Sequence, residues 1–231
     1  MCAEQVRKLI VAIDGPAGAG KSTVAKRLAK ELGYTYMDTG AMYRAFAWRV
    51  MKEGIDLSDE KKLERVLQDT SIELLEQDGR SSVLLNGVDV TDRIRTPELS
   101  QLASRVSTSK LLREWMVELQ WDMGCHGGVV AEGRDIGTVV FPNAEVKVFL
   151  DASSEERARR RFEELRSQGR EVTVEETLEE MEQRDRRDRE RDVAPLRKAE
   201  DAVVIDSTHA GVDGVVERIM QEIKRKQSAI Q

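Results

Sequence analysis

Cysteine is scarce in this chain of 231 residues, and long apolar runs are missing. The two cysteines, Cys2 and Cys125, lie far apart and form no C-x-x-C pair, which excludes a zinc ribbon or a dithiol redox site. The apolar run at residues 9–13 is far shorter than the ~18 residues of a membrane span. Residues 1–8 contain no apolar core of a signal peptide, so we expect a cytoplasmic protein with reduced thiols and no membrane partner.

An excess of basic residues is also missing. The chain has 37 lysines and arginines against 43 acidic residues, a formal net charge of -6. A nucleic-acid binder is usually basic, because neutralising phosphates supplies most of its affinity. We therefore expect no DNA or RNA partner, although arginines gathered in one place can still surround a small anion. The content of 40% hydrophobic and 35% charged residues indicates a folded globular chain.

Histidine offers no metal site. His126 stands beside Cys125, but two ligands are too few for a zinc site, and His209 has no evident partner. The only metal that the sequence predicts is the Mg²⁺ that accompanies a nucleotide, as argued below.

The order of apolar segments predicts an α/β fold. Residues 9–13 form a short β-branched run, typical of a buried parallel strand, and a glycine-rich turn follows. Val24, Leu28 and Leu32 then recur at helical spacing, and Gly33 fits a left-handed helix end. Further strands are predicted at 34–37, 129–131, 146–150 and 203–205, with helices at 41–52, 97–125, 153–168, 174–189 and 212–226. This alternation predicts a central parallel β-sheet flanked by helices.

One segment departs from that alternation. Residues 71–75 and 82–85 read as short strands joined through Asp78 and Gly79. Asn86-Gly87 is a strong hairpin signal, and Val88 and Val90 alternate after it. We expect a small antiparallel insertion here.

The turn after the first strand carries the most specific motif. Residues 15–22 match G-x-x-x-x-G-K-[ST] at every fixed position, between a predicted strand and a predicted helix. Backbone N–H groups of such a loop surround phosphates, Lys21 reaches the β- and γ-phosphates of ATP, and the Ser22 hydroxyl contacts Mg²⁺. The predicted ATP-binding residues are Gly15, Pro16, Ala17, Gly18, Ala19, Gly20, Lys21, Ser22 and Thr23. A chance glycine-rich turn is the alternative, which the strand-loop-helix context disfavours.

Two classes of phosphate-loop protein compete. A GTPase-like switch needs D-x-x-G and N-K-x-D segments. The only asparagines, Asn86 and Asn143, do not begin N-K-x-D, and D-x-x-G does not occur. A non-catalytic nucleotide switch is therefore a weak alternative to a small-molecule kinase.

A kinase must gather cations around the transferred phosphoryl group. Two predicted helices supply them: Arg157, Arg159, Arg160, Arg161, Arg166 and Arg170 in one, and Arg184, Arg186, Arg187, Arg189 and Arg191 in the next. Pairing with carboxylates on a solvated face, as for Arg184 and Asp188 at i, i+4, explains part of this pattern. The arginines outnumber their acidic neighbours, so we expect some of them in the active site.

Several further segments resemble the bacterial-type cytidylate kinase family. They are residues 38–44 (DTGAMYR), 132–142 (EGRDIGTVVFP), 150–158 (LDASSEERA), 184–188 (RDRRD) with Ala194-Pro195-Leu196, and 206–208 (DST). The resemblance covers nearly the whole chain and implies a P-loop NTPase fold. It further implies a core at about 6–60, 126–154 and 190–227, an NMP-binding insertion at about 61–125 and an arginine-rich lid at about 155–190.

The resemblance also implies the roles of individual residues. Thr39 and Asp188 would approach the CMP sugar, with Arg184 nearby. The CMP phosphate would be held by Arg44, Arg134 and Arg191, and the cytosine edge would be recognised by Ser104, Arg113 and Asp135. A carboxylate suits cytosine, because its N4 amino group is a donor where uracil presents a carbonyl. Arg157 would join the ATP site, and the catalytic residues would be Lys21, Arg134, Arg184 and Arg191.

We therefore expect ATP- and Mg²⁺-dependent phosphorylation of CMP and dCMP by a monomer. Another nucleoside monophosphate kinase, with UMP or AMP as acceptor, is the alternative. No side chain should be needed as a general base, since the attacking group is a phosphate oxygen.

Overall fold

The computed structural model describes residues 8–77 and 80–230, so the predicted turn at Asp78 and Gly79 lies outside it. Five strands form the central sheet in the order β2-β6-β1-β7-β8, and every neighbouring pair is parallel. They are β1 (Ile10–Asp14), β2 (Thr35–Asp38), β6 (Val129–Gly133), β7 (Val146–Asp151) and β8 (Val203–Asp206). The predicted parallel sheet is confirmed.

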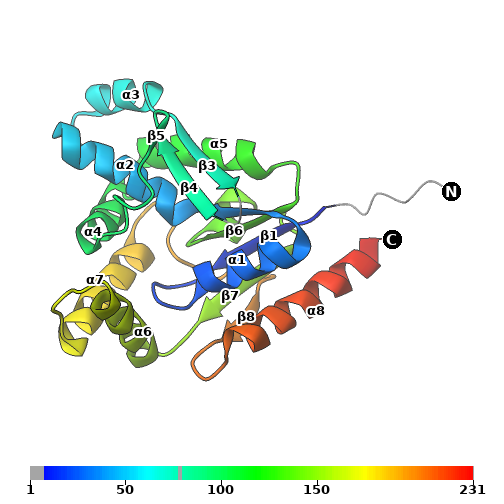
Figure 1. Ribbon diagram of the computed structural model, residues 1–231. Coiled ribbons are helices and arrows are strands. Elements are labelled where there is room, and N and C mark those ends of the chain that lie inside the picture. Colours follow the sequence, from blue (N-terminus) through cyan, green and yellow to red (C-terminus); the bar gives the residue numbers. More distant parts are fainter. Residues whose placement is uncertain (1–7, 78–79, 231) are drawn as a thin grey trace.

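Helices cover both faces of this sheet (Figure 1). On one face, α1 (Lys21–Leu32) and α8 (Val212–Ile230) pack against each other and bury Val24, Leu28 and Ile219. On the other face, α5 (Lys110–Gly124) covers Ala131 and Met37 together with η1 (Ile136–Val140), a π-helical turn that the sequence did not predict. The strands are apolar on both faces for this reason.

The predicted insertion contains a three-stranded antiparallel sheet in the order β3-β4-β5. Its strands are β3 (Ile72–Gln77), β4 (Arg80–Leu85) and β5 (Val88–Asp89), and the hairpin predicted at Asn86-Gly87 joins the last two. The surrounding helices are α2 (Thr39–Glu53), α3 (Glu60–Gln68) and α4 (Pro97–Val106). A separate hydrophobic cluster joins α2, α3, β3, β4, α4 and α5, with Phe46 and Met116 fully buried in it.

The helices differ from the sequence prediction in number: one predicted helix is divided, and one helix was not predicted. The stretch predicted as one helix at 97–125 is two helices, because Ser109 begins α5 by accepting a hydrogen bond from the Leu112 N–H. The helix α3 was not predicted, since it is highly charged and buries only Leu63 and Leu67.

The helices α6 (Ser154–Ser167) and α7 (Val174–Glu190) form a hairpin to one side of the central sheet (Figure 1). We call this hairpin the lid. Ser153 caps α6, and Thr173 with Glu176 forms a capping box for α7, so both predicted helix starts are confirmed. None of the helices in residues 8–77 and 80–230 has the length and apolarity needed to cross a membrane.

Candidate active site

A large cleft of about 1550 Å³ lies at the carboxyl ends of β1, β2 and β6. Its walls come from the phosphate loop, from the α2–α4 region and from the lid. Ligands of open parallel sheets bind at this edge. The volume exceeds the ~300–1,000 Å³ of an ordinary small-molecule pocket and leaves room for two nucleotides.

The phosphate loop lies between β1 and α1, as predicted. Gly15 approaches β7 so closely that a Cβ atom there would lie 1.9 Å from the Leu150 carbonyl oxygen. Gly20 (φ 89°) takes a left-handed conformation and leaves the first N–H groups of α1 without a side-chain cap, as an anion site requires. The loop residues lining the cleft are Ala17, Gly18, Gly20, Lys21, Ser22 and Thr23, whereas Gly15, Pro16 and Ala19 of the predicted ATP-binding set do not line it.

Lys21 is only 6% exposed, and its Nζ donates a 2.7 Å hydrogen bond to the Pro16 carbonyl oxygen. Burial, reinforced by the charges of Arg134 and Arg184, lowers the pKa of Lys21 to about 7. An anion bound beside Lys21 would favour the charged form of its ammonium group.

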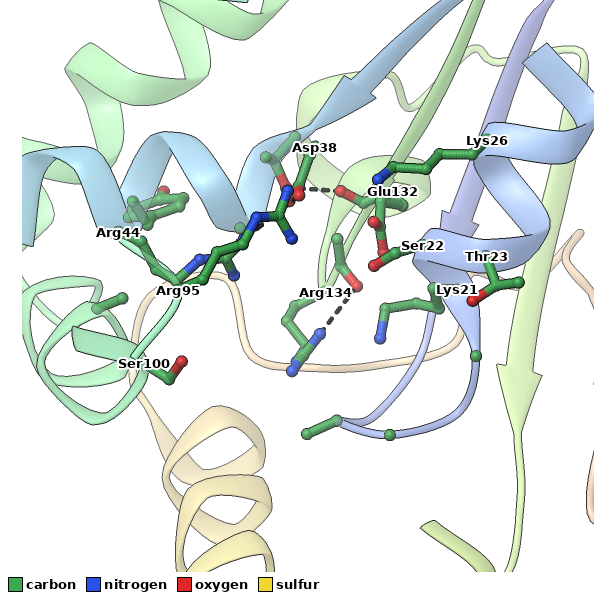
Figure 2. A pocket seen from close by; sticks show the side chains of 18 of the residues that line it. Lys21, Ser22, Thr23, Lys26, Asp38, Arg44, Arg95, Ser100, Glu132 and Arg134 are labelled. Carbon is green, nitrogen blue, oxygen red and sulfur yellow. Dashed lines mark hydrogen bonds and ion pairs between the residues drawn. The ribbon is translucent and has the colours of Figure 1, made fainter. Parts of the chain in front are cut away.

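Arginines from several elements line the cleft together with Lys21. Figure 2 shows Arg44 and Arg95 entering the cleft from one side and Lys21 from the other, with Arg134 between them. Burial and the charge of Arg134 lower the pKa of Arg184 to about 10. Arg134 and Arg44 have carboxylate partners: Arg134 Nε lies 2.9 Å from Asp188 Oδ2, and Arg44 Nη2 lies 3.3 Å from Asp38 Oδ2.

Glu132, for which the sequence predicted no role, lies near the end of β6, close enough to Lys21 for the two charges to interact. Its Oε1 accepts a 2.6 Å hydrogen bond from the Tyr36 hydroxyl. Burial, with the nearby charge of Asp38, raises the pKa of Glu132, while Lys21 and the Ser22 hydroxyl act in the opposite direction. Its position directly after a predicted strand, inside the EGRD segment, was the signal available in the sequence.

These groups fit a nucleotide-bound Mg²⁺. No three or more His, Cys, Asp or Glu side chains within residues 8–77 and 80–230 gather as a metal site of their own. The Ser22 hydroxyl and the Glu132 carboxylate instead offer hard oxygen donors beside the loop. Mg²⁺ takes one or two such protein ligands and completes its shell with phosphate oxygens and water.

The predicted base-reading residues also line the cleft. Arg113 Nη2 forms a close ion pair with Asp135 Oδ2, and both side chains are buried. Burial raises the pKa of Asp135, against the opposing charges of Arg113 and Arg191. Ser104 Oγ donates a 3.1 Å hydrogen bond to Asp188 Oδ1 and so connects this group to the predicted sugar site.

Arg191 lies in this group and not beside Lys21. Its Nη2 is 3.8 Å from Asp135 Oδ1, and its Nη1 donates a 3.1 Å hydrogen bond to Ser107 Oγ. The resemblance implied a phosphate role for Arg191, but its contacts join it to the base-reading residues. Tyr43, omitted from the predicted site, also lines the cleft, and its ring centre is 5.7 Å from the Arg113 guanidinium.

Several buried polar atoms in the lining of the cleft make no hydrogen bond. Among the described residues, the buried side-chain atoms without a hydrogen-bond partner include four arginine nitrogens and one phenol oxygen of this lining: Arg44 Nε, Arg113 Nε, Arg184 Nε, Arg191 Nη2 and Tyr43 Oη. Buried donors are normally satisfied. Their concentration here indicates a ligand rich in acceptor atoms.

All of the predicted acceptor-site residues line this one cleft: Thr39, Arg44, Ser104, Arg113, Arg134, Asp135, Arg184, Asp188 and Arg191. Arg157 does not line it. Its guanidinium lies behind the phosphate loop, where Nη1 contacts Asp185 Oδ2 at 2.5 Å and the Ala17 carbonyl oxygen at 3.0 Å.

The fold and this cleft define a P-loop phosphotransferase. Residues 11–225 match the family described as Cytidylate kinase, and the chain belongs to this family.

Three relatives that bear the name Cytidylate kinase show the extent of the match. The protein of Syntrophotalea carbinolica is 52% identical over 221 residues, covering 96% of this chain and 94% of its own length. That of Bacillus subtilis is 50% identical over 220 residues, covering 95% of this chain and 98% of its own. That of Geobacillus kaustophilus is 54% identical over 220 residues, again covering 95% and 98%.

Proposed function

We propose that this protein transfers the γ-phosphoryl group of ATP to the phosphate of CMP or dCMP. The observation that carries the proposal is the cluster of Lys21, Arg134 and Arg184 between the phosphate loop and the base-reading residues. Mutual repulsion and burial make this cluster unfavourable without an anion, whereas two facing phosphate groups would satisfy it.

In this proposal the ATP phosphates bind along residues 15–23. The N–H groups at the start of α1 contact the phosphates, and Lys21 exchanges its bond to Pro16 for the β- and γ-oxygens. Ser22, with Glu132 close behind it, would hold Mg²⁺ and its water. When bound, Mg²⁺ offsets the charge that develops on the phosphate oxygens.

The CMP phosphate would contact Arg44, Arg134 and Arg184, which all line the cleft. The ribose would lie against Thr39 and Asp188, with Arg184 nearby. This places the acceptor oxygen between the arginines and Lys21, where positioning and charge neutralisation lower the barrier.

In the base site, Asp135 would accept a hydrogen bond from the cytosine N4 amino group. Arg113, Ser104 and Arg191 would complete the base site, since Arg113 and Arg191 both contact the same carboxylate. Uracil would direct a carbonyl oxygen toward Asp135. Two acceptor oxygens would then face each other in a buried site without a proton between them, so discrimination between the two bases can be large.

The acceptor needs no proton removed. A phosphate monoester has its second pKa near ~6, so the attacking oxygen is already ionised at neutral pH. The role left to the protein is to orient two polyanions and exclude water. We assign the latter to the lid at about 155–190 and the NMP-binding insertion at about 61–125, which flank the cleft. The monomeric state and the cytoplasmic location stay predictions.

The test is direct. The purified chain is incubated with ATP, Mg²⁺ and CMP, and products are separated by ion-exchange chromatography. We expect equal amounts of CDP and ADP, no product after chelation of Mg²⁺ with EDTA, and no product from a folded Lys21→Ala variant on the same time scale. ADP without CDP would show hydrolysis and contradict the proposal.

A further inference from the structure

Two lid residues contact the phosphate loop without lining the cleft. Arg157 lies on α6 and Asp185 on α7, and their ion pair is 2.5 Å long between Arg157 Nη1 and Asp185 Oδ2. The exposed fractions of the two side chains are 5% and 2%. An ion pair buried to this degree is costly to desolvate, so the geometry around it must compensate.

The peptide groups on both sides of Ala17 are held by this pair. The Ala17 N–H donates a 3.3 Å hydrogen bond to Asp185 Oδ1, and the Ala17 carbonyl oxygen accepts a 3.0 Å bond from Arg157 Nη1. The three groups therefore form a closed ring of hydrogen bonds. A ring of this kind fixes the orientation of the loop at Ala17.

The next residue is held by packing. A Cβ atom on Gly18 would lie 2.8 Å from Met181 Cε and 3.0 Å from the Arg157 carbonyl oxygen. Met181 comes from α7, one turn before Asp185. Both lid helices thus press on the loop where it bends toward the cleft.

Arg157 has little capacity left for a ligand. Besides Ala17 and Asp185, its Nε donates to the Ala152 carbonyl oxygen at 3.1 Å and its Nη2 to Ser154 Oγ at 3.3 Å. Arg134 and Arg184 differ from it, since both line the cleft.

We infer that Arg157 and Asp185 are positioning residues that hold Ala17 and Gly18 of the phosphate loop in the conformation that binds ATP. The inference rests on the proposed role of this loop in binding ATP phosphates, and it replaces the predicted contact of Arg157 with ATP. The loop binds phosphate through backbone N–H groups, so a small rotation of one peptide weakens the site. The lid therefore sets the affinity for ATP from behind the loop.

The primary variant is Arg157→Lys. Lysine keeps the positive charge opposite Asp185, but its single ammonium group cannot donate to Ala152, Ala17 and Asp185 together. Asp185→Asn is the complementary change, because the amide oxygen can still accept from Ala17 while the charge opposite Arg157 is lost. Arg159→Ala on α6 and Arg186→Ala on α7 are matched controls, since both arginines are exposed and neither lines the cleft.

Affinity for ATP is measured by isothermal titration calorimetry without an acceptor, and affinity for CMP separately. We expect Arg157→Lys and Asp185→Asn each to bind ATP about 10²-fold more weakly, the scale of a displaced binding group. CMP affinity should stay within about two-fold, and both controls should match the wild type. A merely structural role would lower the melting temperature and weaken ATP and CMP equally. That result, or unchanged ATP affinity, would overturn the inference.

Amide exchange of the wild-type protein provides a test that needs no variant. The Ala17 N–H should exchange slowly in the ligand-free protein, because Asp185 accepts from it. Exchange at the rate of an open loop would overturn the inference. If the wild type binds ATP but does not phosphorylate CMP, the proposed function fails. The ATP titrations would still decide whether Arg157 and Asp185 position the phosphate loop.

Discussion

Arg134 Nε donates a 2.9 Å hydrogen bond to Asp188 Oδ2, which joins the end of β6 to the last turns of α7 across 54 residues of sequence. Burial alone would raise the pKa of Asp188, but the charges of Arg134 and Arg184 outweigh it and hold the pKa below its usual range. The proposed acceptor site is therefore partly assembled before a nucleotide binds, with one wall from the end of β6 and one from α7.

Replacing Lys21 should separate stability from activity. Lys21→Met removes a preorganised charge, so kcat should fall by a factor on the order of 10² or more. The same change should raise the melting temperature of the ligand-free protein at pH 7, because the wild type buries an ammonium group among arginines.

The pH dependence of that stability difference follows from the pKa of Lys21. Burial lowers it from 10.5 to about 7, so the unfolded chain binds the extra proton between these values. Wild-type stability from this group therefore rises with pH across that window, and the advantage of Lys21→Met should shrink from pH 7 toward pH 10. Differential scanning fluorimetry at several pH values checks this, and an advantage that grows with pH would contradict it.

Asp14 is a second buried charged residue whose replacement should lower the free energy of unfolding. Its two carboxylate oxygens accept 2.8 Å hydrogen bonds from the N–H groups of Ile136 and Gly137, at the start of η1. Asp14→Asn has one acceptor oxygen for two donors, and a buried donor left unsatisfied costs about 1–3 kcal/mol. Urea denaturation should show that loss in the free energy of unfolding.

The Asp14→Asn variant should impair binding of CMP more than binding of ATP. Asp135 directly precedes η1, so a shift of Ile136 displaces the base-reading carboxylate. We expect the KM for CMP to rise more than the KM for ATP in Asp14→Asn. An unchanged denaturation midpoint together with unchanged KM values would show that the two hydrogen bonds have no such role.

Alanine variants of three arginines in or next to the lid should differ sharply in their kinetic constants. Arg184→Ala should lower kcat by about 10²-fold, because it removes a cation from the phosphate cluster. Arg191→Ala should mainly raise the KM for CMP, since Arg191 contacts Asp135. Arg166→Ala should resemble the wild type, because Arg166 lies over the Phe162 ring, 5.6 Å from its centre, and does not line the cleft. Steady-state kinetics with CMP as variable substrate distinguish the three, and the reverse ranking would show that the acceptor site is misplaced.

Loss of both histidines should leave the pH profile unchanged. The acid limb of kcat/KM should follow ionisation of the acceptor phosphate near ~6 and persist in the His126→Ala/His209→Ala variant. A carboxylate-to-amide change that lowers kcat by ~10⁴ without altering CMP binding would instead reveal a general base.

Local patterns predicted the parallel sheet, the phosphate loop and the lid helices, because each is set by short-range spacing. Other features depend on distant contacts. The π-helical η1 is held by Asp14, 122 residues earlier in the chain, so no local sequence pattern predicts it. The helix α3 is mostly charged and is held by two leucines in a shared core.

The same reason limits the prediction of side-chain roles. The family resemblance selected the predicted acceptor-site residues, but it did not show that Arg191 contacts Asp135 and Ser107. Nor could a run of arginines reveal that Arg157 contacts Ala17 and Asp185, since both partners come from other elements. Tyr43 shares one face of α2 with Thr39, a spacing that could have placed it in the site.

The central claim is that the base-reading group around Asp135 makes this phosphotransferase act on cytidine nucleotides. The most direct measurement is a competition in one mixture of CMP, dCMP, UMP, AMP and GMP with limiting ATP, in which mass spectrometry quantifies each diphosphate. The ratios of product give the ratios of kcat/KM. We predict CDP and dCDP as the main products, less UDP, and negligible ADP beyond that formed from ATP, with AMP labelled isotopically to separate the two sources. Labelled ADP or UDP as the main product would contradict the account.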